Sequence, residues 1–453
     1  MTDFSQSSEA TPTAKPKSES LFKMDARTKK RNAAETRFKF YGIVAIGIGL
    51  LMLVVLVTNI VTAGTGAFQQ SFLDLNVELK ADKLDKKGNR NIEDIKKVST
   101  FGYAPLIASA LESEVEKLGI QSGLTPKEMG KILSKAAQAE LRNFVIANPG
   151  KIGETVSFRF LVNSRVDGYM KGRVSRESIA NDKGISVEQL DFVDQLRNAG
   201  VLYKAFNPDF IFGTDASDQR PEAAGIGVAM LGSLFMMFVV LALALPIGVA
   251  ASIYLEEFAP QNRLTDIIEV NISNLAAVPS IVFGILGLAV FINYMHLPTS
   301  APLVGGLVLT LMTLPTIIIS TRASLKAVPP SIRDAALGVG ASKMQAVFHH
   351  VLPLAAPGIL TGTIIGLAQA LGETAPLLLI GMVGFIASNA PDGVVAGFLS
   401  PNSAMPAQIY EWSKRADPAF YERAWGGIII LLIFLVTMNT IAVILRRRFE
   451  RRW

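Results

Sequence analysis

The chain has 453 residues, of which 50% are hydrophobic and 18% are charged, whereas about a quarter of the residues in an ordinary soluble protein are charged. Its net charge of +6 gathers beside apolar segments, where membrane orientation already requires basic residues, so we expect no nucleic-acid partner. The absence of cysteine excludes disulfides and thiolate metal sites.

The N-terminal region combines a polar tail with an apolar segment. Residues 1–38 are rich in Ser, Thr, Ala and Lys, which predicts a disordered, basic cytoplasmic tail. Residues 39–63 predict a first transmembrane helix, because their apolar core of about 20 residues is longer than the 7–15 of a signal peptide.

Residues 64–220 form a polar insert that the expected topology places outside the cytoplasm. Two stretches alternate apolar and polar side chains and predict strands; their apolar members are Leu73, Leu75, Val77 and Leu79, then Val156, Phe158, Phe160 and Val162. Thr125 with Glu128 and Ser186 with Gln189 predict helix starts. The insert is therefore expected to be an α+β domain with its own core, either contacting a partner or acting as a spacer.

Six segments are long enough, at about 20 residues each, to cross a bilayer. They lie near residues 40–61, 223–253, 270–295, 302–321, 354–382 and 424–445. Basic residues before the first segment, after the fourth and in the tail 447–453 place both termini and the fourth loop in the cytoplasm. We therefore predict an all-α, multi-pass integral membrane protein with six transmembrane helices and an α+β insert between the first two.

The loop 329–353 carries signals for two short helices. Ser331 is expected to cap the first, Gly338 and Gly340 permit a turn, Ser342 caps the second, and Pro353 ends the element. The second helix has one apolar face, formed by Met344, Val347, Phe348 and Val351. Such a face could lie on membrane lipid, but the helix–glycine–helix arrangement favours docking into a protein groove.

At this loop the chain resembles the EAA loop of ABC-importer permeases. The resemblance rests on Asp334-Ala335-Ala336, Gly340 and Leu352-Pro353, with Asp334 in place of Glu and His350 in place of Ile. It implies a coupling loop that seats in an ATP-hydrolysing subunit through Arg333, Asp334, Ala335, Ala336, Gly340, Met344, Phe348, Leu352 and Pro353. The chain lacks a G-x-x-x-x-G-K-[ST] loop, so we expect a transporter subunit and not an enzyme.

Residues 221–446 are similar to the PstA-type permeases of phosphate ABC transporters. The motifs are Ser252-Ile253-Tyr254-Leu255-Glu256-Glu257, Val278-Pro279-Ser280-Ile281-Val282-Phe283-Gly284, Gly372-Glu373-Thr374-Ala375-Pro376-Leu377-Leu378 and Ala424-Trp425-Gly426-Gly427. The resemblance implies import of inorganic phosphate across the bacterial inner membrane without a cofactor. It also implies three partners, namely a homologous permease (PstC-like), an ATP-binding subunit (PstB-like) and a periplasmic phosphate-binding protein (PstS-like).

Glu373 is the candidate for the substrate pathway. It lies about 20 residues beyond Pro353, roughly 30 Å along a helix, and Pro376 favours a kink beside it. An acid at that depth in a membrane is by default a functional candidate, although a structural acid bonded to a neighbouring helix is the alternative. Hydrogen phosphate keeps a proton that a carboxylate can accept, whereas sulfate does not.

The other pathway candidates are Thr374, Gln369 and Arg322. The family commonly has arginine at the position of Gln369, and Arg322 could instead serve as a positive-inside anchor. Two further functions stay open: a permease for another oxyanion such as sulfate or molybdate, and a membrane-anchored sensor with an external ligand domain. Neighbouring His349 and His350 point about 100° apart on a helix, so we expect no metal site there.

Overall fold

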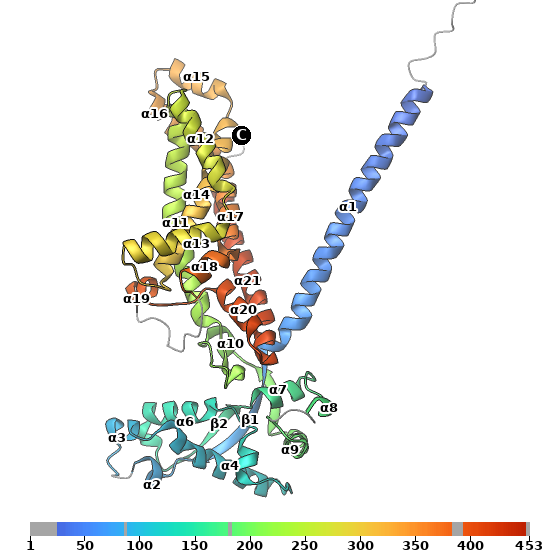
Figure 1. Ribbon diagram of the computed structural model, residues 1–453, viewed down its shortest axis with the longest axis vertical. Coiled ribbons are helices and arrows are strands. Elements are labelled where there is room, and N and C mark those ends of the chain that lie inside the picture. Colours follow the sequence, from blue (N-terminus) through green and yellow to red (C-terminus); the bar gives the residue numbers. More distant parts are fainter. Residues whose placement is uncertain (1–24, 86–87, 180–183, 383–392, 450–453) are drawn as a thin grey trace, which may run out of the picture. The chain divides into compact units, whose positions relative to one another are not determined.

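The computed structural model describes residues 25–85, 88–179, 184–382 and 393–449 (Figure 1). The chain divides into two units at the boundary between Asn59 and Ile60, and each is described by itself. The first unit consists of helix α1 (Ala26–Gly64) up to Asn59. Helix α1 begins before the predicted boundary at residue 39, so part of the predicted tail is helical, and residues 1–24 lie outside the described residues.

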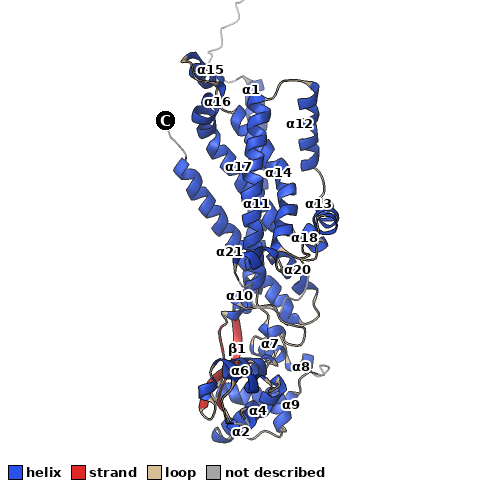
Figure 2. Ribbon diagram, turned by 90° about the vertical axis from the view of Figure 1, so that its left-hand side faces the viewer, coloured by secondary structure: helices blue, strands red, loops and turns tan. Residues whose placement is uncertain are grey.

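The second unit begins with an insert built on a small sheet. The central strand β1 (Gln69–Glu78) pairs antiparallel with β2 (Thr155–Leu161) on one side and β3 (Leu202–Phe206) on the other. Among the described residues, Figure 2 shows strands only in this part of the chain. The alternation that predicted β1 and β2 is confirmed. From Leu73 to Glu78 the apolar members of β1 are buried while Asp74, Asn76 and Glu78 are half-buried or exposed, and Phe158 and Phe160 of β2 are buried.

Short helices surround this sheet. They are η1 (Thr65–Phe68), α2 (Ala81–Leu84), α3 (Ile92–Lys96), η2 (Thr100–Tyr103), α4 (Ala104–Lys117), α5 (Pro126–Gly130), α6 (Ala136–Ala147), η3 (Pro149–Lys151), α7 (Ser164–Met170), α8 (Arg176–Ile179), α9 (Val187–Asn198), α10 (Asp209–Phe212) and η4 (Pro221–Ala223). Both predicted capping boxes are present, at the starts of α5 and α9.

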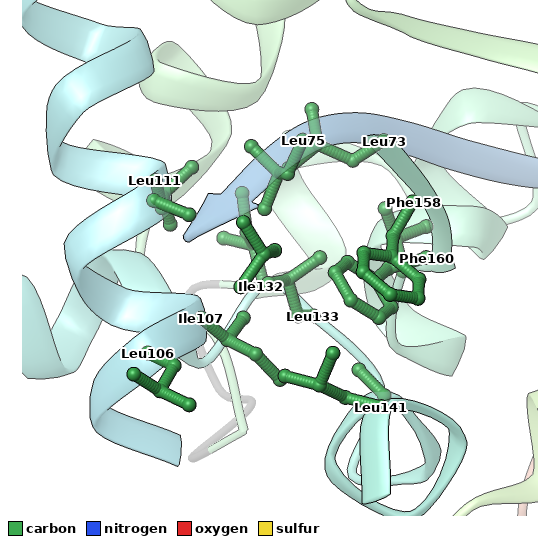
Figure 3. Close-up of a cluster of buried hydrophobic side chains, with 14 of the residues drawn as sticks. Leu73, Leu75, Leu106, Ile107, Leu111, Ile132, Leu133, Leu141, Phe158 and Phe160 are labelled. Atoms are coloured by element: carbon green, nitrogen blue, oxygen red, sulfur yellow. The ribbon is translucent and has the colours of Figure 1, made fainter. Parts of the chain in front are cut away.

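The insert has its own hydrophobic core. Leu75 of β1 and Phe158 and Phe160 of β2 point toward Leu111 of α4 and Leu141 of α6 (Figure 3). The phenylalanine rings stack at 5.4 Å between centroids. A buried cluster of this size supports a folded α+β domain and not a linker.

Within the described residues, five helices are long and apolar enough to cross a membrane. They are α1, α11 (Gly227–Ile253) with η5 (Tyr254–Phe258), α14 (Pro302–Lys326), α17 (Leu352–Gly372) with its preceding turns, and α21 (Pro418–Phe449). A sixth segment is broken: α12 (Arg263–Ala276) and α13 (Ser280–Leu286) with η6 (Gly287–Tyr294) bend by 103°. The fold class is confirmed, but the expected continuous helix at 270–295 is wrong, because Pro279 interrupts it.

Glycines let the long helices approach one another. Gly306 of α14 faces Val239 of α11, and Gly358 and Gly362 of α17 face Ser324 and Ser320 of α14, with no space for a Cβ. Small residues at such contacts allow the close backbone packing that holds helices together in lipid. The remaining elements are α15 (Pro330–Gly338), α16 (Lys343–Ala346), η7 (Val347–Val351), α18 (Ala375–Leu379), α19 (Val394–Leu399) and α20 (Met405–Lys414).

Candidate functional site

The predicted coupling loop consists of helices α15 and α16 joined at Gly340. Gly340 has φ +87°, a conformation that residues with a Cβ rarely adopt, and its N–H closes α15 on the carbonyl of Leu337. Ser342 and Gln345 form the predicted capping box of α16. Ser331 does not cap α15, because the helix begins at Pro330 and Pro329 occupies the cap position.

Pro353 does not end this element. Helix α16 continues through the π-helical turn η7 into α17, with Pro353 in the first turn of α17. A proline within a helix removes one N–H donor and crowds the carbonyl four residues earlier, and the wider turn η7 lies at that place. The coupling loop is therefore continuous with a membrane helix.

Arg333 holds α15 to the adjoining ends of two membrane helices. Its guanidinium contacts the Glu257 carboxylate after α11 at 2.6 and 3.1 Å. It also donates to the carbonyls of Leu325 and Val328, at the end of α14, at 2.9 and 2.8 Å. Glu257 is buried, so this bidentate pair is a strong, directional attachment.

The predicted apolar face of the second helix is divided between two environments. Val347 and Val351 are buried in a cluster with Ile253 and Leu325, whereas Met344 and Phe348 are exposed. The two exposed side chains line a groove of about 530 Å³ against the end of α11. One half of the face therefore anchors the loop and the other half is open.

The tip of the loop adds to this open apolar surface. Val339 is 87% exposed and Leu337 is also exposed. Of the remaining loop residues, Asp334 and Ala335 are exposed, Ala336 is buried, and Leu352 and Pro353 are half-buried. His350 is exposed, so a polar group at this position does not disturb the packing below it.

Arg322 lies in an ion cluster at the same end of the bundle. It contacts Glu256 at 3.3 Å and Glu269 of α12 at 2.6 Å. Lys326 contacts Glu256 at 3.6 Å. The two neighbouring acids, Glu256 and Glu257, thus bind arginines from α14 and α15, roles that the sequence reasoning missed although their motif was noticed.

Glu373 occupies a break between two helices. Helix α17 ends at Gly372, Glu373 has an extended backbone, and α18 begins at Ala375 with Pro376 in its first turn. The expected kinked but continuous helix is wrong here, because Pro376 starts a new helix instead of bending the old one. Both Glu373 and Thr374 are half-buried.

The two broken segments meet at this point. A Cβ added to Gly284 of α13 would lie 2.7 Å from Cα of Pro376, so the backbones of α13 and α18 are in close contact (Figure 1). Gln369 is exposed one turn before the break. The break therefore places Glu373, Thr374 and Gln369 near one another.

The structure does not bring Arg322 to this group. Gly358 faces Ser324 and Gly362 faces Ser320, which places Arg322 level with residue 360 of α17. Glu373 is about 13 residues further along, roughly 20 Å at 1.5 Å per residue. The four predicted pathway residues thus divide into one group at the helix break and one arginine in the ion cluster with Glu256 and Glu269.

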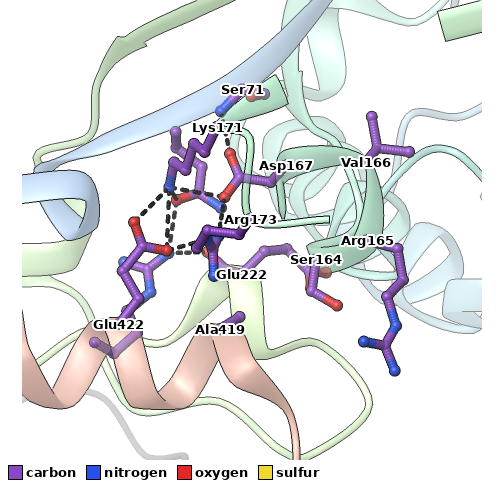
Figure 4. Close-up of polar contacts among 12 residues, drawn as sticks. Ser71, Ser164, Arg165, Val166, Asp167, Lys171, Arg173, Glu222, Ala419 and Glu422 are labelled. Carbon is purple, nitrogen blue, oxygen red and sulfur yellow. Dashed lines mark hydrogen bonds and ion pairs between the residues drawn. The ribbon is translucent and has the colours of Figure 1, made fainter. Parts of the chain in front are cut away.

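A second buried charge cluster joins the insert to the start of α21 (Figure 4). Asp167 contacts Lys171 at 2.7 Å and Arg173 at 3.1 Å, and both bases contact Glu422 of α21, at 3.2 and 2.6 Å. The backbone N–H of Ser71 in β1 also donates to Asp167. We call these residues the insert–α21 joint. Charged residues in the first turn of an otherwise apolar span were the available sequence signal.

Arg423 and Glu222 extend this joint. Arg423 donates to Gln70 at 2.9 Å and to the carbonyl of Glu222 at 2.6 Å, while the Glu222 carboxyl is hydrogen-bonded to Ser134. Burial raises the pKa of the Glu222 carboxyl above its ordinary value, and the Ser134 hydrogen bond and the Arg423 charge act in the opposite direction. The insert is therefore bonded to the membrane domain by side chains from several elements.

Two family models match separate regions of the chain. Residues 244–453 match the family described as "Binding-protein-dependent transport system inner membrane component", and residues 25–180 match a "Domain of unknown function (DUF3333)". The chain is 30% identical over 241 residues to the probable ABC transporter permease protein YqgI of Bacillus subtilis, which covers 51% of this chain and 81% of that protein.

Two further similarities were found. The phosphate transport system permease protein PstA 1 of Mycobacterium tuberculosis is 31% identical over 230 residues, covering 51% of this chain and 73% of that protein. A solved structure of the MetNI methionine ABC transporter in inward-facing conformations is 16% identical, with a TM-score of 0.37, covering 50% of this chain and 95% of that chain.

Proposed function

Since this chain belongs to the binding-protein-dependent transport system inner membrane components, as a PstA-type permease of ABC importers, we propose that it carries inorganic phosphate across the bacterial inner membrane. The observation that carries the proposal is the identity of about 30% to phosphate permeases, which extends over half the chain.

The helix break supplies a chemical reason for phosphate. Glu373 is half-buried in the break between α17 and α18, so its side chain is partly accessible to a ligand. A carboxylate there accepts a hydrogen bond from the P–OH group that phosphate retains at neutral pH, whereas sulfate has no proton to donate and offers the carboxylate only repulsion. Thr374 and Gln369 add neutral hydrogen-bonding groups beside it.

The coupling loop supplies the connection to ATP hydrolysis. The exposed side chains of Leu337, Val339, Met344 and Phe348 form an apolar surface that an ATP-binding subunit would cover. A homologous permease would complete the pathway beside the exposed Gln369, and a phosphate-binding protein would deliver the substrate. This arrangement places both termini and the coupling loop in the cytoplasm, and the insert outside.

Phosphate uptake tests this proposal. The chain is expressed with its partner subunits in cells that lack their own high-affinity phosphate permease, and uptake is measured with and without excess sulfate. We expect uptake that sulfate does not suppress. Glu373→Gln is expected to reduce the uptake or its discrimination against sulfate, while Glu411→Gln in α20 leaves both unchanged. Normal, sulfate-resistant uptake by Glu373→Gln would contradict the assigned role of Glu373.

A complete lack of phosphate uptake has a separate meaning. If the chain inserts into the membrane and associates with the ATP-binding subunit but transports no phosphate, the substrate assignment is wrong while the permease family stands. The same cells then report uptake of sulfate and molybdate, which identifies the alternative oxyanion.

A further inference from the structure

The insert contains a polar groove that the transport proposal does not use. It lies among α4, α5, α6 and α7 and has a volume of about 800 Å³. Small-molecule sites in proteins commonly measure about 300–1,000 Å³, so the groove is of a suitable size for a ligand larger than a single water or ion. Its walls combine Pro105 and Ala108 of α4 with polar residues from the other elements.

The rim of the groove is basic. Lys127, Lys131 and Lys135 line it at intervals of four residues, and all three are exposed. Lys127 lies in α5, Lys131 directly follows that helix and Lys135 directly precedes α6, and like charges gathered at one surface repel one another. Within the described residues, Lys135 donates a long hydrogen bond of 3.4 Å to Gln219, and Lys131 interacts electrostatically with the neighbouring Glu128 carboxylate without a direct hydrogen bond to it.

Other lining residues continue the same chemistry. Arg165 adds a further cation at the start of α7, and Gln138 and Asn163 add amide groups. Glu222 is the only acid among the described residues that line the groove, and it is buried and bonded to Ser134. A hollow lined mainly by one sign of charge concentrates ligands of the opposite sign.

The floor of the groove is part of the attachment to α21. Glu222 accepts a hydrogen bond from Arg423 through its carbonyl, at 2.6 Å. Ser164 donates to Asp417, which directly precedes α21, at 3.2 Å. A ligand that contacts Ser164 or the Ser134–Glu222 pair therefore touches residues that hold the first turn of a membrane helix (Figure 4).

We propose that this groove binds a small polyanion carrying phosphate or carboxylate groups, and that its occupancy stabilises the contact between the insert and α21. The lysines supply the charge, and the amide and hydroxyl groups of the wall supply hydrogen bonds of fixed direction. A ligand that binds Ser164 or the Ser134–Glu222 pair restrains residues that also contact α21 or the residue before it. Ligand binding and the contact between the insert and α21 therefore stabilise each other.

Calorimetric titration of the full chain in lipid nanodiscs tests the binding. Pyrophosphate, inorganic phosphate and citrate are titrated separately at low ionic strength. We expect saturable binding of at least one of them, weakened about tenfold or more in the triple variant Lys127→Gln, Lys131→Gln, Lys135→Gln. The matched control replaces Lys96, Lys117 and Lys151, three insert lysines that do not line the groove, and is expected to bind as the unchanged chain does.

The pattern of ligands identifies the chemistry. Binding of pyrophosphate or phosphate without citrate indicates a phosphate-bearing ligand, and binding of citrate indicates a carboxylate. The proposal is overturned if no probe binds saturably, or if the triple variant binds all probes as tightly as the control does. Since the assay uses no transport or ATP, its failure leaves the proposed transport function untouched.

Hydrogen exchange tests the link to α21. Addition of the bound probe is expected to slow exchange of the amides at residues 419–426 in the unchanged chain and not in the triple variant. Unchanged exchange in these amides despite saturated binding would refute the coupling while retaining the site.

Discussion

Replacement of Arg333 by alanine is expected to release α15 from the membrane helices. The guanidinium makes hydrogen bonds to the Glu257 carboxylate and to two carbonyls at the end of α14. Arg333 and Glu257 have side chains that are 23% and 6% exposed, so solvent replaces these bonds poorly. Charged hydrogen bonds contribute about 1.5–3 kcal/mol, and a buried acid left without its base costs about 3–5 kcal/mol.

The expected loss in the free energy of local opening is about 3 kcal/mol, a roughly hundredfold increase in amide exchange. The assay is hydrogen exchange of the amides in α15, measured on the full chain in nanodiscs. Lys326→Ala is the matched control, because Lys326 is 60% exposed and its contact with Glu256 is 3.6 Å, so the expected effect is below about 1 kcal/mol.

A double-mutant cycle shows whether the pair itself is responsible. With Glu257→Ala added, the loss should be clearly smaller than the sum of the two single losses, since the second substitution removes the buried acid that the first leaves unpaired. Strictly additive losses, or an exchange rate for Arg333→Ala equal to that of Lys326→Ala, would refute the assignment of Arg333 as the attachment of α15.

Three further predictions concern the coupling loop and the insert–α21 joint. Gly340→Ala is expected to destabilise the α15–α16 turn by about 1–2 kcal/mol because φ is positive there, which loop-amide exchange measures, whereas Gly338→Ala, at a helical glycine with open space around it, should not. Asp167→Ala leaves Lys171 and Arg173 with Glu422 but removes their second buried acid and the acceptor of the Ser71 N–H, so it should lower the unfolding free energy by about 1–3 kcal/mol in denaturant titrations, against about 0–1 kcal/mol for Glu154→Ala in an exposed pair. The raised pKa of Glu222 means that the folded state favours its protonated form, so the stabilisation is fully present below the ordinary carboxyl pKa and is lost as pH rises through the raised value. Glu222→Gln should therefore flatten the fall in unfolding temperature that accompanies a rise in pH above the ordinary carboxyl value of 4.5, and an unchanged slope would contradict this assignment.

Local sequence patterns predicted the insert well. The alternation around Leu73, Leu75 and Val77 reports one buried face of a strand, and the cap residues Thr125 and Ser186 act on backbone groups only three residues away. Such patterns depend only on residues close together in the chain, so they can be recognised without knowledge of the tertiary structure. The pairing of β1 with both β2 and β3 depended on distant segments and was not predictable from them.

Hydropathy predicted the number of apolar segments but not their continuity. An apolar run reports composition, and the same composition serves a straight helix or two short ones. The prolines Pro279 and Pro376 were visible in the sequence, but each was compatible with a kink as well as with a new helix start. The predicted depth of Glu373, roughly 30 Å beyond Pro353, agrees with the length of α17, but the helix break that follows Gly372 was not predicted.

The ion pairs that hold the coupling loop were also beyond local patterns. Arg333 and Glu257 are separated by 76 residues, and Arg322 and Glu256 by 66. Each residue alone looks like a solvated charge at a membrane boundary, which is the commoner case. The sequence thus predicted the position of the loop and the apolar face of its second helix, but not the ion pairs that attach the loop to the membrane helices.

Because Glu256 and Glu257 are adjacent in the chain, a single turn of the membrane domain is connected to two other helices. The short turn η5 is attached to two other helices. Glu257 binds Arg333 of α15, and Glu256 binds Arg322, which also binds Glu269 of α12. Helix α12 ends at the 103° bend near Pro279, and α13, which follows the bend, packs against α18 at Pro376. A continuous series of contacts thus joins the α15–α16 loop to the helix break at Glu373, through η5, Arg322, α12, α13 and α18.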